Sequence, residues 1–414
     1  MFTSYADGDN NSPGPRRPPL DDVLRSRSYR LLWSAQFAAL LAGYFNYVAV
    51  AWLTLRITGS SLAVGAVLAA ASVPQAALML LGGAASDRSS PRTTMLAASL
   101  ARGIVMGVLA VLTLTRSVQL WQLFAAAVLV GATTAFFVPA SASLLPRLVA
   151  NDRLEAGNAL LNLGRTLALV LGPAAAGVVV AVAGAGTALG ADAAGSVLAG
   201  LLVAPLPAGG SVASTASPLG DVRDGLLHVW GDTPLRVVLL VVAALNFFAL
   251  GAVEVGLPAL AHLRFGPGAV ALGSAFAAWG LGSTLGSLGA GARPVPGRIG
   301  RLTVVMVAML GAGIAAAGVA PTLPVLLVVM VAVGTVEGAG STYLISWMQR
   351  RTEPGLQGRV MSLAMLASVG LEPVALAAAG AVASRDLGLL FWGSAIAVEL
   401  TALLAALSRS VRRA

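Results

Sequence analysis

The stretch Gly83-Ala84-Ala85-Ser86-Asp87-Arg88-Ser89-Ser90-Pro91-Arg92 joins two long apolar runs, residues 62–86 and 93–115. A helix crosses the hydrocarbon core of a bilayer with about 20 mostly apolar residues, and both runs are long enough. The turn between them holds one acid and two arginines, which is typical of a loop at a membrane surface. The stretch therefore predicts a fold made of membrane-spanning helices, and the rest of the chain decides how many.

The composition excludes a soluble globular domain. Of the 414 residues, 57% are apolar and 10% are charged, whereas soluble domains carry about 25% charged residues. There is no cysteine, which excludes disulfides, thiolate metal sites and cysteine nucleophiles. Neither a His-Glu-x-x-His motif nor a Gly-x-x-x-x-Gly-Lys-Ser/Thr phosphate loop occurs. We therefore expect neither an enzyme nor a nucleotide-driven pump, and no cofactor or metal.

Twelve runs along the chain are apolar and long enough to cross a membrane. They are residues 31–55, 62–86, 93–115, 119–145, 158–183, 186–207, 236–261, 269–291, 302–319, 322–347, 360–383 and 387–407. The runs are rich in Ala, Gly and Leu and show no two-residue alternation, which favours helices over a β-barrel. The sequence thus predicts an all-α integral membrane protein with twelve transmembrane helices.

The loop arginines fall almost entirely on one side of this predicted membrane. With the N-terminus inside, twenty arginines lie on the inner side and only Arg56, Arg116, Arg264 and Arg385 on the outer side. Cytoplasmic loops of membrane proteins carry such an excess of positive charge. We therefore expect a multi-pass protein of a bacterial plasma membrane with both termini in the cytoplasm. These cytoplasmic arginines explain the pI near 11.2, so the basic character of the chain does not indicate binding to a nucleic acid.

The breaks between the runs divide the chain into five parts. Residues 1–28 are predicted to be a disordered cytoplasmic tail, and residues 29–207 an N-terminal half of six helices. Residues 208–235 form the longest break and are predicted to be a cytoplasmic linker with a surface helix. A second six-helix half follows at 236–407, with a short cytoplasmic tail at 408–414.

The two halves carry traces of an internal repeat. Leu171-Gly172-Pro173 in the fifth run matches Leu371-Glu372-Pro373 in the eleventh at an offset of 200 residues. The turn at Gly83 has a degraded counterpart, Gly289-x-x-x-Arg293, after the eighth run. Such duplication is typical of transporters built from two similar halves around a central site. The sequence therefore predicts two pseudo-symmetric six-helix halves.

Gly83-x-x-x-Asp87-Arg88 with the later Arg92 resembles the loop between the second and third spans of the major facilitator superfamily. The resemblance implies a major facilitator fold in which Gly83, Asp87, Arg88 and Arg92 latch the two halves in one conformational state. The family pattern places a glycine and a further basic residue where this chain has Ser90 and Pro91.

Two further resemblances point to one branch of that superfamily. Gly172, Pro173 and Gly177 resemble the antiporter motif of the fifth span, with alanines in two of its glycine positions. The loop at 349–360, the segment at 257–260 and Arg102-Gly103 are similar to the drug and siderophore exporter branch. These resemblances imply export rather than import. A simple structural kink at Pro173 is the alternative.

Four acids within the runs are candidates for carrying protons: Glu372, Glu337, Glu254 and Asp192. A charge at the centre of a span costs about 2.5–3.5 kcal/mol on insertion scales, so each should face a cavity or a partner. A carboxyl group in such a place can bind and release a proton near neutral pH. Glu372 is the first choice because it adjoins Pro373, where a helix bends. A structural ion pair or a hydrogen bond between helices is the alternative for each acid.

Three residues are candidates for counter-charges or substrate contacts: Arg165, Arg102 and Asn46. Together these features predict a proton-coupled exporter of small amphiphilic molecules such as drugs, siderophores or secondary metabolites, working by alternating access. An importer or symporter of the same fold and a non-transporting membrane receptor remain as alternatives. The expected partners are protons, a small-molecule substrate and the lipid bilayer, and the expected oligomeric state is a monomer.

Overall fold

The computed structural model of the chain is a bundle of long helices. It describes residues 20–88, 90–149, 153–207, 227, 229–265, 268–294, 296–352, 360, 363–365, 367, 368 and 370–408, and these contain no strand. The helices of the first half are α1 (Leu20–Arg25), α2 (Arg27–Thr58), α3 (Ser61–Arg88), α4 (Pro91–Leu114), α5 (Leu120–Leu148), α6 (Leu154–Ala183) and α7 (Ala185–Val203). Those of the second half are α9 (Thr233–Gly251), α10 (Leu257–Arg264), α11 (Gly268–Gly291), α12 (Ile299–Val319), α13 (Leu323–Arg351), α15 (Glu372–Ala383) and α16 (Leu387–Leu407), with a π-helical segment, Ala252–Gly256, between α9 and α10.

The predicted all-α membrane fold is confirmed. Within the described residues, eleven helical stretches are long and apolar enough to cross a membrane, α9 to α10 counting as one. Helix α15 lies in the eleventh predicted run, residues 360–383, and is itself shorter than a full span. Each predicted run therefore coincides with a helix.

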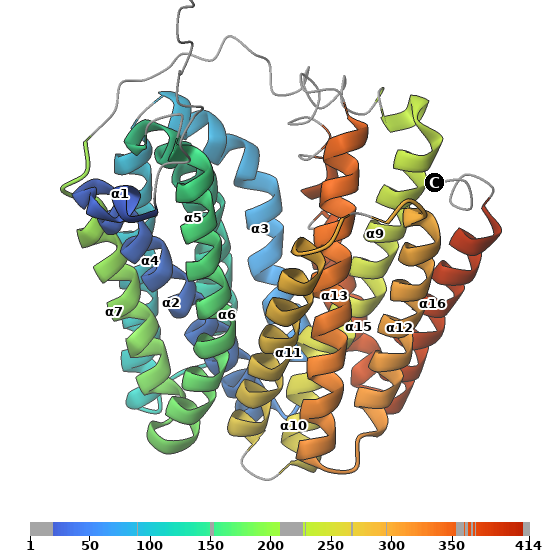
Figure 1. Ribbon diagram of the computed structural model, residues 1–414. Coiled ribbons are helices and arrows are strands. Elements are labelled where there is room, and N and C mark those ends of the chain that lie inside the picture. The colour runs from blue at the N-terminus through green and yellow to red at the C-terminus, as the bar shows by residue number, and fades with distance from the viewer. Residues whose placement is uncertain are drawn as a thin grey trace, which may run out of the picture.

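The helices group into two bundles that stand side by side (Figure 1). In the first, α4 packs along α7 and α3 along α5, and in the second, α11 packs along α13 and α12 along α16. The two bundles touch chiefly through α6 with α11 and α3 with α15. These are the fifth with the eighth and the second with the eleventh predicted runs, so the contacts follow the symmetry expected from a repeat.

Helical structure begins earlier than the sequence predicts at both domain starts. Residues 20–28, assigned to a disordered tail, form α1 and the start of α2, because Ser26 caps α2 and Val23 is buried. Helix α9 begins at Thr233 rather than 236, because the Asp232 side chain accepts a hydrogen bond of 3.1 Å from the backbone of Leu235. The remainder of the N-terminal tail (1–19), most of the predicted linker (208–226) and the end of the C-terminal tail (409–414) lie outside the described residues.

Two helices of the second half are irregular at a candidate acid. The π-helical segment Ala252–Gly256 contains Glu254 and ends just before Pro258. Pro258 has no N–H to donate to the carbonyl of Glu254, four residues earlier. Helix α15 starts at Glu372 after a turn at Gly370 and Leu371. Such irregularities within membrane spans are found where the backbone faces a cavity or another protein element.

Candidate functional site

At one end of the bundle, helices of the two halves are in close backbone contact. A Cβ atom added to Gly177 of α6 would lie 2.5 Å from the carbonyl oxygen of Ala269 in α11. A Cβ atom added to Gly65 of α3 would lie 2.5 Å from the carbonyl oxygen of Leu376 in α15. Only glycine permits the backbones to approach this closely. The halves therefore meet at two glycine crossings, one on each side of the molecule.

Aromatic side chains complete this closed end. The ring of Trp52 lies edge-on to the ring of His262 with centroids 5.2 Å apart, and Tyr47 meets Phe276 in the same way at 5.2 Å. The hydroxyl of Tyr47 also donates a hydrogen bond of 2.9 Å to the backbone carbonyl of Glu254. That carbonyl is the one that Pro258 leaves without its usual helical donor. The hydrogen bond from Tyr47 thus joins the π-helical segment of the second half to the first half.

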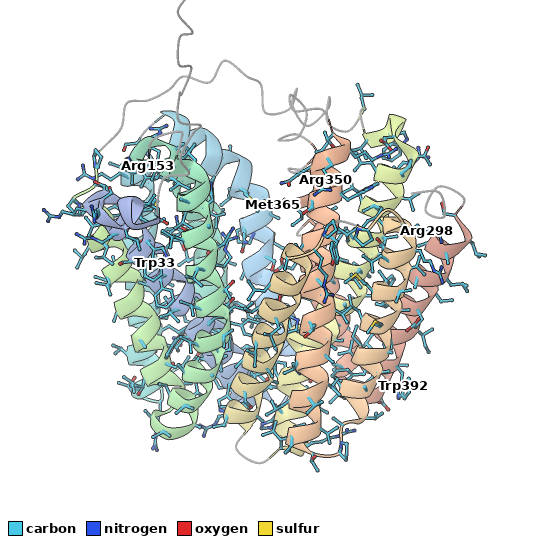
Figure 2. The ribbon with its side chains drawn as sticks, in the orientation of Figure 1. Trp33, Arg153, Arg298, Arg350, Met365 and Trp392 are labelled. Atoms are coloured by element: carbon cyan, nitrogen blue, oxygen red, sulfur yellow. The ribbon has the colours of Figure 1, made fainter. Side chains whose placement is uncertain are left out.

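A cavity of about 980 Å³ lies between the halves and is lined by both. Its lining includes Met365, which lies between the halves in the upper part of Figure 2. Arg153, Arg298 and Arg350 lie at that same end of the bundle. The cavity therefore extends from the closed end toward the arginine-rich end.

The wall of the cavity is mostly apolar and aromatic, with few charges. Six aromatic residues line it: Tyr44, Tyr47, Phe137, Phe276, Trp279 and Tyr343. The charged lining residues are Arg102, Arg165, Glu254 and Glu337. A large apolar cavity with a few polar groups is the usual form of a small-molecule site. Among the described residues, no cluster of three or more side chains suited to a metal occurs.

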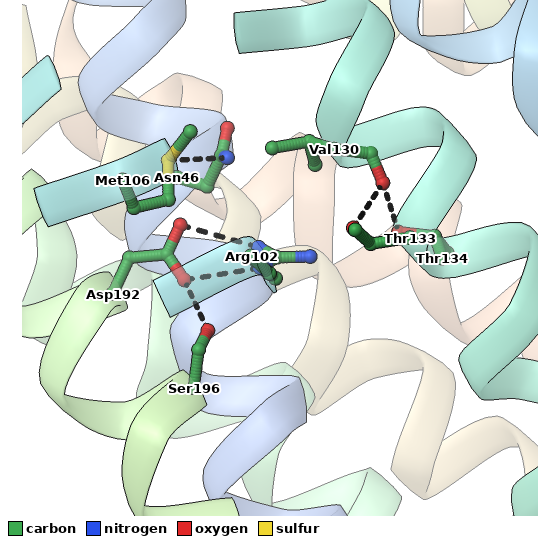
Figure 3. A network of polar contacts seen from close by, with 8 residues as sticks. All are labelled: Asn46, Arg102, Met106, Val130, Thr133, Thr134, Asp192 and Ser196. Carbon is green, nitrogen blue, oxygen red and sulfur yellow. Dashed lines mark hydrogen bonds and ion pairs between the residues drawn. The ribbon is translucent and has the colours of Figure 1, made fainter. Parts of the chain in front are cut away.

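Arg102 is held in place by Asp192, and Figure 3 shows the pair. Its Nε and Nη2 atoms each donate to the Asp192 carboxylate at 3.2 Å, and Ser196 donates to the same carboxylate at 3.1 Å. Asp192 is fully buried behind the cavity wall, whereas the Arg102 side chain keeps 16% of its surface exposed. The structure thus places the proton candidate Asp192 in an ion pair and Arg102 at the cavity surface.

Arg165 projects from α6 into the cavity without a fixed partner. Its side chain is exposed and lies near Tyr44. It makes no ion pair or hydrogen bond within the described part of the chain. Asn46, the third sequence candidate in this half, donates instead to the sulfur of Met106 at 3.3 Å and does not line the cavity.

Two acids of the second half face the cavity. Glu337 of α13 accepts a hydrogen bond of 3.0 Å from Ser283 of α11. Glu254 lies on the π-helical segment, and its carboxylate has no hydrogen bond to any described residue. No cation lies within 4 Å of either carboxylate in the described structure.

Glu372 does not line the cavity. It lies at the crossing of α3 and α15, where its Oε1 atom is 2.6 Å from Oγ of Ser72 in the other half. Glu254 is near enough to interact with it electrostatically. The structure therefore places the first-choice proton carrier at the contact between the halves rather than at the substrate cavity.

The residues of the predicted latch and kink occupy different ends of the molecule. Gly83, Asp87 and Arg88 lie in the last turns of α3 and Arg92 in the first turn of α4, but the side chains of Asp87 and Arg88 fall outside the described structure. Gly172 packs against the ring of Tyr44, and Gly177 forms the α6–α11 crossing. Pro173 lies inside α6, which continues as one helix through it.

Sequence reasoning missed the partners that span the two halves. Ser72, Tyr47, Trp52 and His262 carry no motif, and their roles depend on how the bundles dock. One signal was available, because Pro258 follows Glu254 by four residues and predicts a freed carbonyl.

Comparison with known proteins places this geometry in a family. Residues 32–371 match the family model described as Major Facilitator Superfamily. The chain belongs to the major facilitator superfamily. It is a multi-pass membrane transporter, and the resemblance predicted from Gly83–Arg92 is confirmed.

Relatives and solved structures agree with this family. The chain is 27% identical over 372 residues to the multidrug efflux pump Tap of Mycobacterium tuberculosis and Mycobacterium bovis, covering 86% of this chain and 87% of that protein. The fold is similar to a peptide transporter POT in complex with alafosfalin, with a TM-score of 0.74 and 14% identity over 95% and 99% of the two chains. It is also similar to a bacterial homologue of the iron transporter ferroportin in an inward-facing state, with a TM-score of 0.72 and 18% identity over 93% and 98% of the chains.

Proposed function

We propose that the protein exports small amphiphilic molecules across a bacterial plasma membrane by proton-coupled alternating access. One observation carries the proposal: the cavity opens toward the arginine-rich end and is sealed by packed glycines and aromatic rings at the other. By the positive-inside rule the arginine-rich end is cytoplasmic, with both termini on that side. The conformation is then inward-open and ready to take a molecule from the cytoplasm.

Two observations support export. The Tap relative is named a multidrug efflux pump and aligns over 86% of the chain. Gly172, Pro173 and Gly177 resemble the antiporter motif, and in the structure Gly177 lies at the contact between the halves. The substrates are drugs, siderophores or secondary metabolites that fit a cavity of about 980 Å³ with aromatic walls.

The candidate acids divide into two roles. Glu372 is the first candidate for the proton carrier, because it accepts a hydrogen bond from Ser72 of the other half and is near enough to Glu254 to interact with it electrostatically. Glu337 and Glu254 face the substrate cavity and are the next candidates. Asp192 forms an ion pair with Arg102 and is therefore the least suited of the four acids to carry protons. Coupling follows if protonation of the interface acids favours one docking of the halves over the other.

Two further elements complete the cycle. Arg165 and Arg102 provide positive charge at the cavity wall for the substrate or for the acids. Gly83, Asp87, Arg88 and Arg92 latch the cytoplasmic end when the halves close there. The protein works as a monomer, because the cavity is complete within one chain.

Transport in inverted membrane vesicles tests this function. Vesicles containing the protein should accumulate a fluorescent drug or a siderophore when their interior is acidified, and a proton uncoupler should abolish the accumulation. Vesicles without the protein provide the control. Accumulation that is insensitive to the uncoupler contradicts proton coupling. Accumulation only in right-side-out vesicles favours the importer, and binding without transport in either orientation favours the receptor.

A further inference from the structure

The charges at the cavity wall are divided between the two halves. Both bases, Arg102 on α4 and Arg165 on α6, belong to the first half, and both acids, Glu254 and Glu337, belong to the second. No ion pair joins a base of one half to an acid of the other within the described residues. The empty space between the halves thus separates a positive wall from a negative wall.

We propose that the cavity selects zwitterionic amphiphiles, molecules that carry an acid at one end, an amine at the other and an apolar body between them. The acid group binds the arginines of the first half, and the amine binds the glutamates of the second. The inference rests on the proposed function only in taking this cavity as the substrate site.

The positive wall is built to receive an acid. Asp192 uses Nε and Nη2 of Arg102, and the remaining guanidinium nitrogen points away from Asp192 toward Thr133 and Thr134 (Figure 3). Both threonines line the cavity. The ion pair therefore fixes the orientation of Arg102 and leaves one edge of it for a ligand. Arg165 adds a second guanidinium that is not paired, and two guanidinium groups suit a carboxylate or a phosphate.

The negative wall is built to receive an amine. Glu337 is oriented by Ser283, which donates to its Oε2 atom at 3.0 Å. Glu254 is fixed through its backbone, because its carbonyl accepts the hydrogen bond from Tyr47. An ammonium group has three donors, enough to reach carboxylate oxygens on either helix. The ring of Trp279, which lies edge-on to Phe276 at 6.4 Å, adds an aromatic face that also attracts cations.

The region between the walls suits an apolar body. Tyr44, Tyr47 and Phe276 line the cavity together with aliphatic side chains such as Leu169 and Met306. A ligand with a single charge leaves the opposite wall with unpaired charge near the middle of the bilayer, which is unfavourable. A ligand with both charges satisfies both walls at once. The physical basis for the selectivity is therefore this division of charge.

Binding of four matched ligands to the purified full-length protein in detergent tests the inference. The probe is an anthracene with an aminoalkyl arm and a carboxyalkyl arm on opposite sides. Its three analogues have the carboxyl amidated, the amine acetylated, or both. Fluorescence titration should give the zwitterion an affinity at least tenfold higher than that of the cation or the anion. Equal affinity of zwitterion and cation for the wild-type protein overturns the inference, and this comparison needs no variant.

Two variants assign the walls. Arg165→Gln should lower the affinity for the zwitterion to that for the cation, and Glu337→Gln should lower it to that for the anion. Arg385→Gln and Glu399→Gln change exposed charges that do not line the cavity and should leave the ranking intact. An equal loss of affinity for all four ligands in Arg165→Gln contradicts the assignment.

The assay separates this inference from the proposed function. Binding in detergent requires neither a gradient nor a direction of transport. If the ligand ranking holds while vesicles show no uncoupler-sensitive export, the proposed function fails and the inference stands. If export is seen and the ranking is absent, the inference fails alone.

Discussion

Ser72 and Glu372 lie 300 residues apart in the chain and 2.6 Å apart between Oγ and Oε1. The hydrogen bond joins α3 of the first half to α15 of the second, beside the glycine crossing of Gly65 and Gly380. The Glu372 carboxyl therefore lies at the closed end of the molecule, where the two halves are in contact.

Glu372→Gln should uncouple transport. Glutamine keeps the hydrogen bond to Ser72 but cannot release a proton, so the halves lose the charge that would part them. We expect proton-driven accumulation in inverted vesicles to fall at least tenfold while binding of the substrate in detergent is unchanged. Glu399→Gln, an exposed acid on α16, is the matched control. Normal coupled transport in Glu372→Gln would remove this residue from the mechanism.

Gly177→Ala should open the sealed end. The added Cβ would lie 2.5 Å from the carbonyl oxygen of Ala269, and such overpacking costs about 1–3 kcal/mol. We expect the equilibrium to shift away from the inward-open state. Because the chain has no cysteine, spin labels can be attached at Ser117→Cys and Thr322→Cys without further changes.

Double electron–electron resonance should then show a longer distance between the labels at positions 117 and 322 in Gly177→Ala than in the labelled protein that keeps Gly177. Gly393→Ala, on α16 where nothing lies within 4 Å of the added Cβ, is the control. Unchanged distances in Gly177→Ala would contradict the role of the α6–α11 crossing.

Tyr47→Phe should weaken the same seal more mildly. The change removes one hydrogen bond to the carbonyl of Glu254, worth about 0.5–1.5 kcal/mol, and retains the ring contact with Phe276. We expect an outward shift smaller than that of Gly177→Ala in the same label pair. A shift larger than that of the glycine variant would mean that Tyr47 acts in another way.

Asp192→Asn should destabilise the first half. Removing one partner of a buried ion pair leaves Arg102 uncompensated, at a cost of about 3–5 kcal/mol. We expect a clear fall in the thermal unfolding temperature in detergent. Asp192→Asn combined with Arg102→Gln should recover part of it, because no unpaired charge is then left. A double variant no more stable than Asp192→Asn would argue against the pair.

The topology has its own test. Ser117→Cys, between α4 and α5, should react with a membrane-impermeant maleimide added to intact cells, and Ser408→Cys, after α16, should react only after permeabilisation. The opposite pattern would invert the orientation and with it the proposed direction of transport.

The candidate site shows where sequence reasoning stops. Arg165 and Glu337 were expected to face a cavity or a partner because charge in a bilayer is costly, and both line the cavity. The same argument applied to Asp192 and Glu372, yet one is buried against Arg102 and the other at the contact between the halves. The free-energy cost of a charge in the bilayer therefore does not indicate whether its side chain faces a cavity or is paired with another residue.

The sequence by itself determined the all-helical membrane fold and the family, because hydrophobic length and the turn at Gly83–Arg92 are local properties of the chain. Only the tertiary structure decided which side chains meet across the two halves. When the two bundles dock, Ser72 forms a hydrogen bond with Glu372, and Tyr47 forms one with the carbonyl of Glu254. The same docking brings the backbone of Gly177 close to that of Ala269. That docking depends on helix backbones of the two halves approaching within a few ångströms of each other, and the hydrophobic pattern of the sequence does not specify such distances.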